Sequence, residues 1–256
     1  MTGAMVQLRP LFGVLLLLAA LPFAFKMEPE DFLIFADWRA WRFLGEGVIL
    51  VVVSSVIAIL ASLPLAVFFA LARLSQWRWL RWPSIGYIEA IRALPLLLVI
   101  LYIFLKLPAG LPAFGGREAT ALVLALVIYT AAVNAELIRA GILALEPGQT
   151  EAARSLGLAY WQTMRYVVLP QTFQRVIAPL IAQFTTLLKD TSLGSLIGMV
   201  ELLHRGKIIF QGYRNPMETL YVVAIIYFLL NFALEQASLA VQRRTAGSLP
   251  AATAPR

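Results

Sequence analysis

Lys189 and Asp190 bring opposite charges side by side within the apolar stretch 176–198. Counted from residue 176 at about 1.5 Å per helical residue, they lie roughly 18 Å along it, in the outer half of a bilayer. A charge near the bilayer centre costs about 2.5–3.5 kcal/mol, so such side chains normally face a cavity or a partner. Lys189 could meet a carboxylate and Asp190 an ammonium group along the path of a substrate. The alternative is structural: one side chain pairs with another helix while the other reaches the interface.

Two other charged pairs, Glu89 with Arg92 and Glu136 with Arg139, have a spacing of three residues. Residues three apart share a helix face and can pair with each other, so we expect two structural ion pairs. Asn134 can either hydrogen-bond to a neighbouring helix or contact a substrate. We keep Asn134 among the candidates for the substrate path, although interhelical bonding is its more common role.

The sequence offers no recognisable set of catalytic or metal-ligating residues. It has no cysteine and a single histidine, His204, which excludes thiolate sites and a histidine metal cluster. Neither a G-x-S-x-G nor an H-E-x-x-H pattern is present. A phosphate-binding loop is also absent, because Gly206-Lys207 lacks the required glycine spacing and hydroxyl. We therefore expect no catalytic residue, no metal and no cofactor bound by this chain.

The composition is that of an integral membrane protein. The chain of 256 residues is 61% hydrophobic and only 14% charged, and its mean hydropathy is +0.81. Lipid offers no partners for free backbone groups, so crossing segments must be helices or a closed barrel. Long apolar runs favour helices, and we expect an all-α fold. The net charge of +7 is better explained by basic cytoplasmic loops than by nucleic-acid binding.

Six apolar stretches approach the length of about 20 residues that a membrane-spanning helix needs: residues 11–25, 47–72, 85–107, 119–140, 176–198 and 219–240. The first competes with a cleaved signal peptide, and we favour an uncleaved helix. Basic residues between the second and third stretches place that loop in the cytoplasm, while the acidic segment 26–46 lies outside. Alternation then puts both termini in the cytoplasm. The basic outer segment 201–218 conflicts with this rule.

The segment 146–170 is too polar to cross a membrane, and alternation places it in the cytoplasm. Thr150 can cap a short helix in which Glu151 occupies the first turn. The small residues Ala152 and Ala153 follow, and they would permit close docking into a groove on another protein.

The remainder of this segment predicts a turn and a second short helix. Gly157 can end the first helix in the left-handed conformation, with Leu158 folding back as in a Schellman motif. A second helix over 160–168 would then end before Pro170, where the chain re-enters the membrane. The two helices form either a docking element or an amphipathic hairpin on the lipid surface.

A longer pattern runs through this segment: Glu-Ala-Ala, three residues, Gly, nine residues, an aliphatic residue, one residue, Leu-Pro. It is met by Glu151, Ala152, Ala153, Gly157, Val167, Leu169 and Pro170. It resembles the EAA loop of bacterial ABC importer permeases, with Val167 in place of the usual Ile. The runs IRALPLLLVI, AELIRAGI and LLKDTSLGSLIG are similar to the polar amino acid branch of that family. The resemblance covers residues 45–244.

This resemblance implies a permease subunit with a five-helix core, to which the stretch 11–25 adds a sixth helix. A periplasmic or lipid-anchored binding protein would deliver a polar amino acid, with glutamate and glutamine types favoured. A cytoplasmic ABC ATPase dimer, which holds ATP and Mg, would couple to the loop, and a second permease subunit of the same or a sister chain would complete the path. The coupling residues implied are Glu151, Ala152, Ala153, Gly157, Leu169 and Pro170.

The same resemblance divides the chain into three parts. Residues 1–44 would form the N-terminal helix and an outer loop, residues 45–244 the transmembrane domain, and residues 245–256 a disordered cytoplasmic tail. The location implied is the bacterial cytoplasmic membrane. The alternative function is a secondary transporter without an ATPase, which would need coupling-ion sites and commonly shows repeated halves.

Overall fold

The computed structural model describes residues 20–246 except 21, 23, 109 and 111–113, and its side chains as far as residue 240. The described residues form helices and turns without a strand, which confirms the all-α prediction. In chain order the elements are η1 (Pro29–Ala36), α2 (Trp38–Leu74), α3 (Arg78–Ala93), α4 (Leu96–Lys106), α5 (Arg117–Leu143), α6 (Pro147–Ser155), α7 (Tyr160–Thr163), η2 (Met164–Val168), α8 (Leu169–Asp190), η3 (Thr191–Ile197), α9 (Leu202–Tyr213) and α10 (Pro216–Ala246). Most of the stretch 11–25 and of the tail 245–256 lies outside the described residues, so both stay predictions.

Three described helices, α2, α5 and α10, are long and apolar enough to cross a membrane. A fourth crossing is obtained if α3 and α4 count as one, although they are bent by 105° at their junction. The helix α8 is 22 residues long but is not among these apolar helices. It nevertheless packs on α5 and α10, so its polar positions are partly covered by the rest of the bundle.

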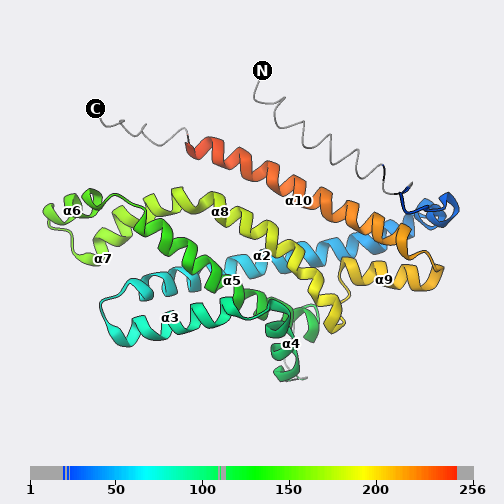
Figure 1. Cartoon of the computed structure of the whole chain (residues 1–256), viewed down its shortest axis with the longest axis horizontal. Coiled ribbons are helices and arrows are strands. Elements are labelled where there is room, and N and C mark those ends of the chain that lie inside the picture. Colours follow the sequence, from blue (N-terminus) through cyan, green and yellow to red (C-terminus); the bar gives the residue numbers. More distant parts are fainter. Residues whose placement is uncertain (1–19, 21, 23, 109, 111–113, 247–256) are drawn as a thin grey trace, which may run out of the picture.

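The stretch 85–107, expected as one span, is two helices. α3 ends at Ala93, Leu94 is extended (φ −83°, ψ 139°), and Pro95 precedes α4. Proline has no N–H to donate and disfavours helical geometry in the residue before it, so the helix breaks here. As a result α4 projects sideways from the bundle (Figure 1).

The stretch 176–198 is likewise different from the expected span. α8 begins earlier, at Leu169, and ends at Asp190, after which the tight turn η3 leads to Gly198 with a left-handed backbone (φ 88°). Lys189 and Asp190 therefore lie in the last turn of α8 rather than part-way along a span.

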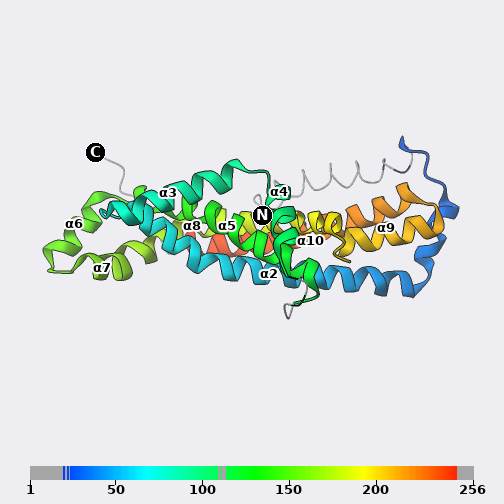
Figure 2. The same cartoon turned by 90° about the horizontal axis from the view of Figure 1, so that it is seen from below.

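The long helices run roughly along one axis of the molecule, with α3 beside α2 (Figures 1 and 2). The α6–α7 hairpin lies at one end, and η1 and α9 lie at the other (Figure 1). α5 is central: 67% of its apolar 18-residue segment is buried inside the structure, compared with 28% for the corresponding segment of α2 and 22% for that of α10. Small residues permit this close packing, since a Cβ on Gly141 would overlap Val176 of α8.

Candidate functional site

The α6–α7 hairpin and η2, here called the knob (residues 146–168), project from one end of the bundle (Figure 1). α6 begins at Pro147, with Glu146 extended before it. Proline suits the first helical position because its φ is already helical and no N–H is needed there. The prediction that Thr150 caps this helix is therefore wrong. Thr150 and the exposed Glu151 lie inside α6.

Gly157 ends α6 in the predicted left-handed conformation, with φ 81°. Its N–H donates to the carbonyl of Arg154 (2.9 Å), and the N–H of Leu158 donates to the carbonyl of Ala153 (3.3 Å). This pair of bonds defines a Schellman motif. No described atom lies within 4 Å of a Cβ placed on Gly157, so glycine is required by the backbone conformation and not by crowding.

The second half of the knob continues into α8 without interruption. α7, the π-helical turn η2 and α8 follow one another, and the backbone stays helical at Met164 and Leu169. Pro170 lies in the first turn of α8, where proline is tolerated. The expectation of a separate helix over 160–168 is therefore wrong, because the knob and α8 share one helical segment.

Only one of the two alanines that were expected to permit docking lies on the outer surface of the knob. Ala153 is buried at 4% exposure, while Glu151 and Ala152 are exposed. Ala153 therefore closes the hairpin from inside, and Ala152 is the alanine of this pair that a partner can approach. Leu156 and Trp161 are 83% and 63% exposed. Large exposed apolar side chains are typical of a surface that a partner or the membrane covers.

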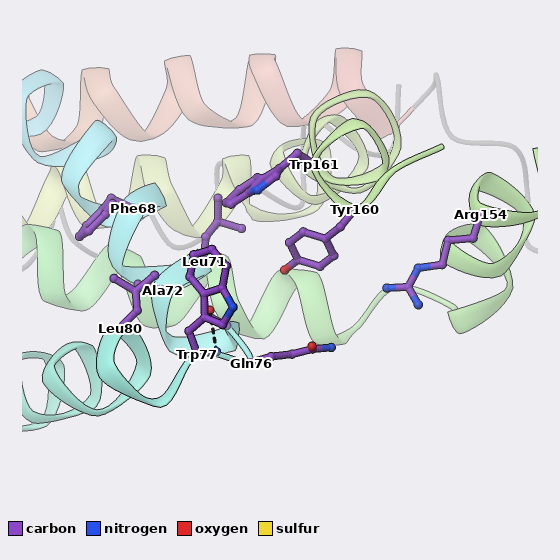
Figure 3. Close-up of a pocket in the computed structure, with 10 residues that line it drawn as sticks. Phe68, Leu71, Ala72, Gln76, Trp77, Leu80, Arg154, Tyr160 and Trp161 are labelled. Carbon is purple, nitrogen blue, oxygen red and sulfur yellow. Dashed lines mark hydrogen bonds between the residues drawn. The ribbon is translucent and has the colours of Figure 1, made fainter. Parts of the chain in front are cut away.

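A pocket of about 400 Å³ lies between the knob and the α2–α3 hairpin (Figure 3). Tyr160 and Trp161 approach it from α7, and Leu71 and Trp77 line the opposite side (Figure 3). Arg154 of α6 also lines this mostly apolar pocket. Burial raises the pKa of Tyr160 above its ordinary value.

The base of the knob is attached firmly to the bundle. Val168 is 2% exposed and belongs to an apolar cluster with residues of α2, α3 and α5. Arg175 of α8 donates to the carbonyl of Ala144 at 2.6 Å, and Gln171 donates to Gln149 at 3.2 Å. A displacement of the knob must therefore move α8 and the adjacent end of α5 with it.

An ionic network joins α2, α3 and α5 near the knob. The Arg73 guanidinium lies 3.0 Å from Glu89 and 3.1 Å from Glu136. Glu136 also pairs with Arg139 at 2.6 Å, as their spacing predicts. The expected pair of Glu89 with Arg92 is wrong, because Glu89 binds a cation from another helix. A pattern within one helix cannot reveal such a partner.

At the end of α8, Lys189 is exposed and Asp190 is half-buried, and neither forms an ion pair with another described helix. Asn134 is different: it is fully buried, and its amide atoms have no hydrogen-bond partner among the described residues. No hydrogen bond or ion pair among the described residues joins these three candidates, because Asn134 lies inside the bundle and Lys189 and Asp190 lie in the last turn of α8.

A second cluster, around Glu201 at the start of α9, was not foreseen from the sequence. The buried carboxylate accepts hydrogen bonds from the N–H groups of Leu203 (2.8 Å) and His204 (2.9 Å) and from the Tyr227 hydroxyl (2.9 Å). Burial raises the pKa of Glu201 above its ordinary value and outweighs the opposite effect of these bonds. An acid that precedes a helix suits its positive end, which is the signal present in the sequence. The contact with Tyr227 depends on the fold.

Two of the three Lys and Arg residues of the segment 201–218, Arg205 and Lys207, are engaged within the structure, whereas Arg214 is exposed. Arg205 pairs with Glu46 at 2.8 Å and donates to the carbonyl of Phe43 at 2.9 Å. Lys207 donates to Ser195 at 3.1 Å. Arg205 and Lys207 therefore differ from free loop charges, which explains their conflict with a rule based on short basic loops, whereas the conflict remains for Arg214.

In the part of the chain that the structure describes, no group of three or more His, Cys, Asp or Glu side chains could hold a metal ion. The absence of a metal and of a cofactor stays a prediction.

Residues 62–247, which include the knob and every helix from α3 to α10, match the model of the family described as binding-protein-dependent transport system inner membrane component. The chain belongs to this family. It is the membrane permease of an ABC importer, a transport component whose family works with ATPases and binding proteins.

Individual relatives agree with this assignment. The permease is 37% identical over 182 residues to the probable glutamine ABC transporter permease protein GlnM of Bacillus subtilis (strain 168), covering 71% of this chain and 83% of that one. It is 31% identical over 209 residues to the glutamine transport system permease protein GlnP of Escherichia coli (strain K12), covering 82% and 95%.

Solved structures show the same fold. A crystal structure of an amino acid ABC transporter with histidines has a TM-score of 0.74 and 31% identity, covering 83% of this permease and 98% of that chain. The inward-facing MetNI methionine ABC transporter has a TM-score of 0.65 at 20% identity, covering 81% and 96%.

Proposed function

We propose that this permease carries a polar amino acid of the glutamate or glutamine type into a bacterial cell. The relatives named for glutamine transport, at 37% and 31% identity, support this substrate class. A relative named for L-cystine transport, TcyB of Bacillus subtilis (strain 168), is 35% identical over 207 residues. L-Cystine is therefore the most informative competitor in a test of the substrate.

In this proposal the knob lies in the cytoplasm and docks into a groove on an ATPase of a dimer that binds ATP and Mg²⁺. The exposed Glu151, Ala152 and Leu156 support a helix-in-groove contact. Ala153 and Gly157 shape the hairpin that presents them. Leu169 and Pro170 act differently, because they lie where the knob becomes α8.

The remaining partners follow from this orientation. The end with η1 and α9 faces outwards and receives the binding protein, periplasmic or lipid-anchored. A second permease subunit, of the same or a sister chain, completes the translocation path. Both termini of the permease lie in the cytoplasm, and the assembly resides in the bacterial cytoplasmic membrane surrounded by lipid.

The helical continuity from the knob to Asp190 is the observation that carries the mechanism. Closure of the ATPases displaces the knob, and the attachments of Arg175 and Val168 transmit the motion to α8 and α5. α8 is about 33 Å long at 1.5 Å per residue, so its far end can respond to a motion at its base. Lys189 and Asp190 at that end would meet the carboxylate and ammonium groups of the amino acid.

The test is uptake of L-glutamine, L-glutamate and L-cystine by the complete complex in proteoliposomes, with its binding protein and ATPases. We expect ATP-dependent uptake of glutamine or glutamate that excess L-cystine does not suppress. Uptake of neither amino acid would contradict the substrate class. Uptake that persists without ATP and follows an ion gradient would favour the alternative, a secondary transporter.

A further inference from the structure

Arg92 is a cation that the ionic network near the knob leaves without a partner. It is exposed in the subunit, and it forms neither a hydrogen bond nor an ion pair among the described residues. Its charge nevertheless acts on Glu136, so it belongs electrostatically to the same group. Counted together, the three arginines Arg73, Arg92 and Arg139 and the two carboxylates Glu89 and Glu136 carry one excess positive charge.

The position of Arg92 along α3 makes this charge unusual. α3 begins at Arg78, beside Trp77 and Trp79, whose rings are 59% and 70% exposed and suit a membrane interface. Fourteen helical residues later, Arg92 lies about 21 Å along the axis, inside a hydrocarbon core about 30 Å thick and past its midpoint. A charge at that depth is stable only against water or a polar partner.

The backbone beside Arg92 leads independently to the same conclusion. α3 ends one residue later, and its last carbonyl groups lack partners within the helix. Residues 92–95 are all exposed in the subunit. Non-helical backbone is tolerated at membrane depth only where protein covers it or where it lines a water-filled cavity. The break between α3 and α4 therefore does not face lipid.

We propose that Arg92 lines the translocation path at the α3–α4 break and binds the α-carboxylate of the transported amino acid. A guanidinium presents two parallel N–H groups to a carboxylate, which gives both attraction and orientation. The assignment rests on the proposed function, since it takes the substrate to be an amino acid. It adds Arg92 to Lys189 as a second cation of the path. α4 starts four residues after Arg92, and its Val99 belongs to the same apolar cluster as Leu187, which lies two residues before Lys189.

Accessibility tests the location of Arg92 without reference to any substrate. The permease contains no cysteine, so Arg92→Cys introduces a single thiol. We expect a charged, membrane-impermeant methanethiosulfonate to label this variant in the complete complex in lipid nanodiscs, in either the nucleotide-free or the vanadate-trapped state. Ala58→Cys, at a fully buried position, is the unreactive control. Absence of labelling in both states would overturn the proposal.

Transport tests the role of Arg92 in binding. At saturating loaded binding protein, we expect Arg92→Met to reduce uptake of L-glutamine and of L-glutamate about tenfold, equally for both because they share the α-carboxylate. Arg92→Lys should recover part of the rate. Arg78→Met, at the exposed opposite end of α3, is the matched control and should transport normally.

The other outcomes separate this proposal from the proposed function. Normal uptake by Arg92→Met would overturn the role of Arg92 and leave the importer intact, and a loss confined to glutamate would contradict binding of the α-carboxylate. Loss of the assembled complex would show that Arg92 pairs with the second permease subunit instead. If the wild-type complex takes up neither amino acid, the substrate class is wrong, and the labelling result still decides whether Arg92 lines the path.

Discussion

The knob and the ionic network lie near each other, but they are built in opposite ways. The knob owes its shape to neighbours in sequence. Pro147 starts α6, and at its end the N–H groups of Gly157 and Leu158 donate to carbonyls three and five positions earlier. The network joins Arg73 to carboxylates 16 and 63 residues away, at Glu89 and Glu136. A local motif can be presented to a partner as a unit, whereas the network exists only when three helices have assembled.

The largest effect is expected from Glu136→Gln, which removes the carboxylate shared by two arginines. Arg73 and Arg139 are 18% and 25% exposed, so their charges would remain poorly solvated. We expect a loss of about 2 kcal/mol, seen as a melting temperature about 4–8 °C lower for the purified complex. Glu89→Gln is the control, since Glu89 is 62% exposed and its loss should cost well under half as much. Equal shifts would show that the network is not centred on Glu136.

A smaller effect on stability, but a large one on coupling, is expected from Gly157→Val. A branched side chain in the left-handed region costs about 1–2 kcal/mol, so the turn should distort while the bundle stays folded. Transport-linked ATPase activity of the reconstituted complex should fall several-fold. Gly157→Asn, which tolerates this conformation, should retain most activity. Full coupling in the valine variant would mean that the turn does not set the contact with the ATPase.

The substitution Lys189→Met tests the end of α8 that lies farthest from the knob. If Lys189 lines the path, uptake should fall about three- to tenfold, equivalent to roughly 1 kcal/mol, while the complex still assembles. Initial uptake rates and size-exclusion profiles measure the two effects. A failure to assemble would instead assign Lys189 to a structural contact with another subunit.

The smallest effect is expected for Glu201→Gln at the start of α9, where the substitution should change how the melting temperature depends on pH. Since the folded pKa of Glu201 is raised, its contribution to stability is largest below its unfolded pKa of about 4.3 and is lost as pH rises through the folded value. The wild-type complex should therefore lose slightly more melting temperature than the glutamine variant between about pH 4 and pH 8. Parallel curves would show that Glu201 does not titrate in this range.

The contrast between contacts within a short stretch of sequence and contacts between distant helices explains what could be predicted from the sequence. The Gly157 turn and the Glu136–Arg139 pair involve residues at most five positions apart, and their spacing suffices to predict them. The family was also accessible, because the EAA pattern combines a turn, small residues and a proline at fixed intervals. Thr150 was misjudged as the cap of α6, because Pro147 at the first helical position already starts this helix.

Contacts between distant segments could not be predicted in this way. The partner of Glu89 comes from the end of α2, and that of Glu201 comes from α10. The break at Pro95 was hidden by hydropathy, since both halves of the stretch 85–107 are apolar and a proline can also kink a continuous helix.

The polarity of α8 has a consequence for how the permease enters the membrane. Arg175 and Gln171 near its start and Lys189 at its end make this helix a poor candidate to leave a translocation channel for lipid alone. α5, which precedes it in synthesis, provides the groove in which Val176 meets Gly141, and α10, which follows, covers another side. We expect the later helices to be released into the bilayer as an assembled group, so that membrane insertion and tertiary folding are a single event for this half of the chain.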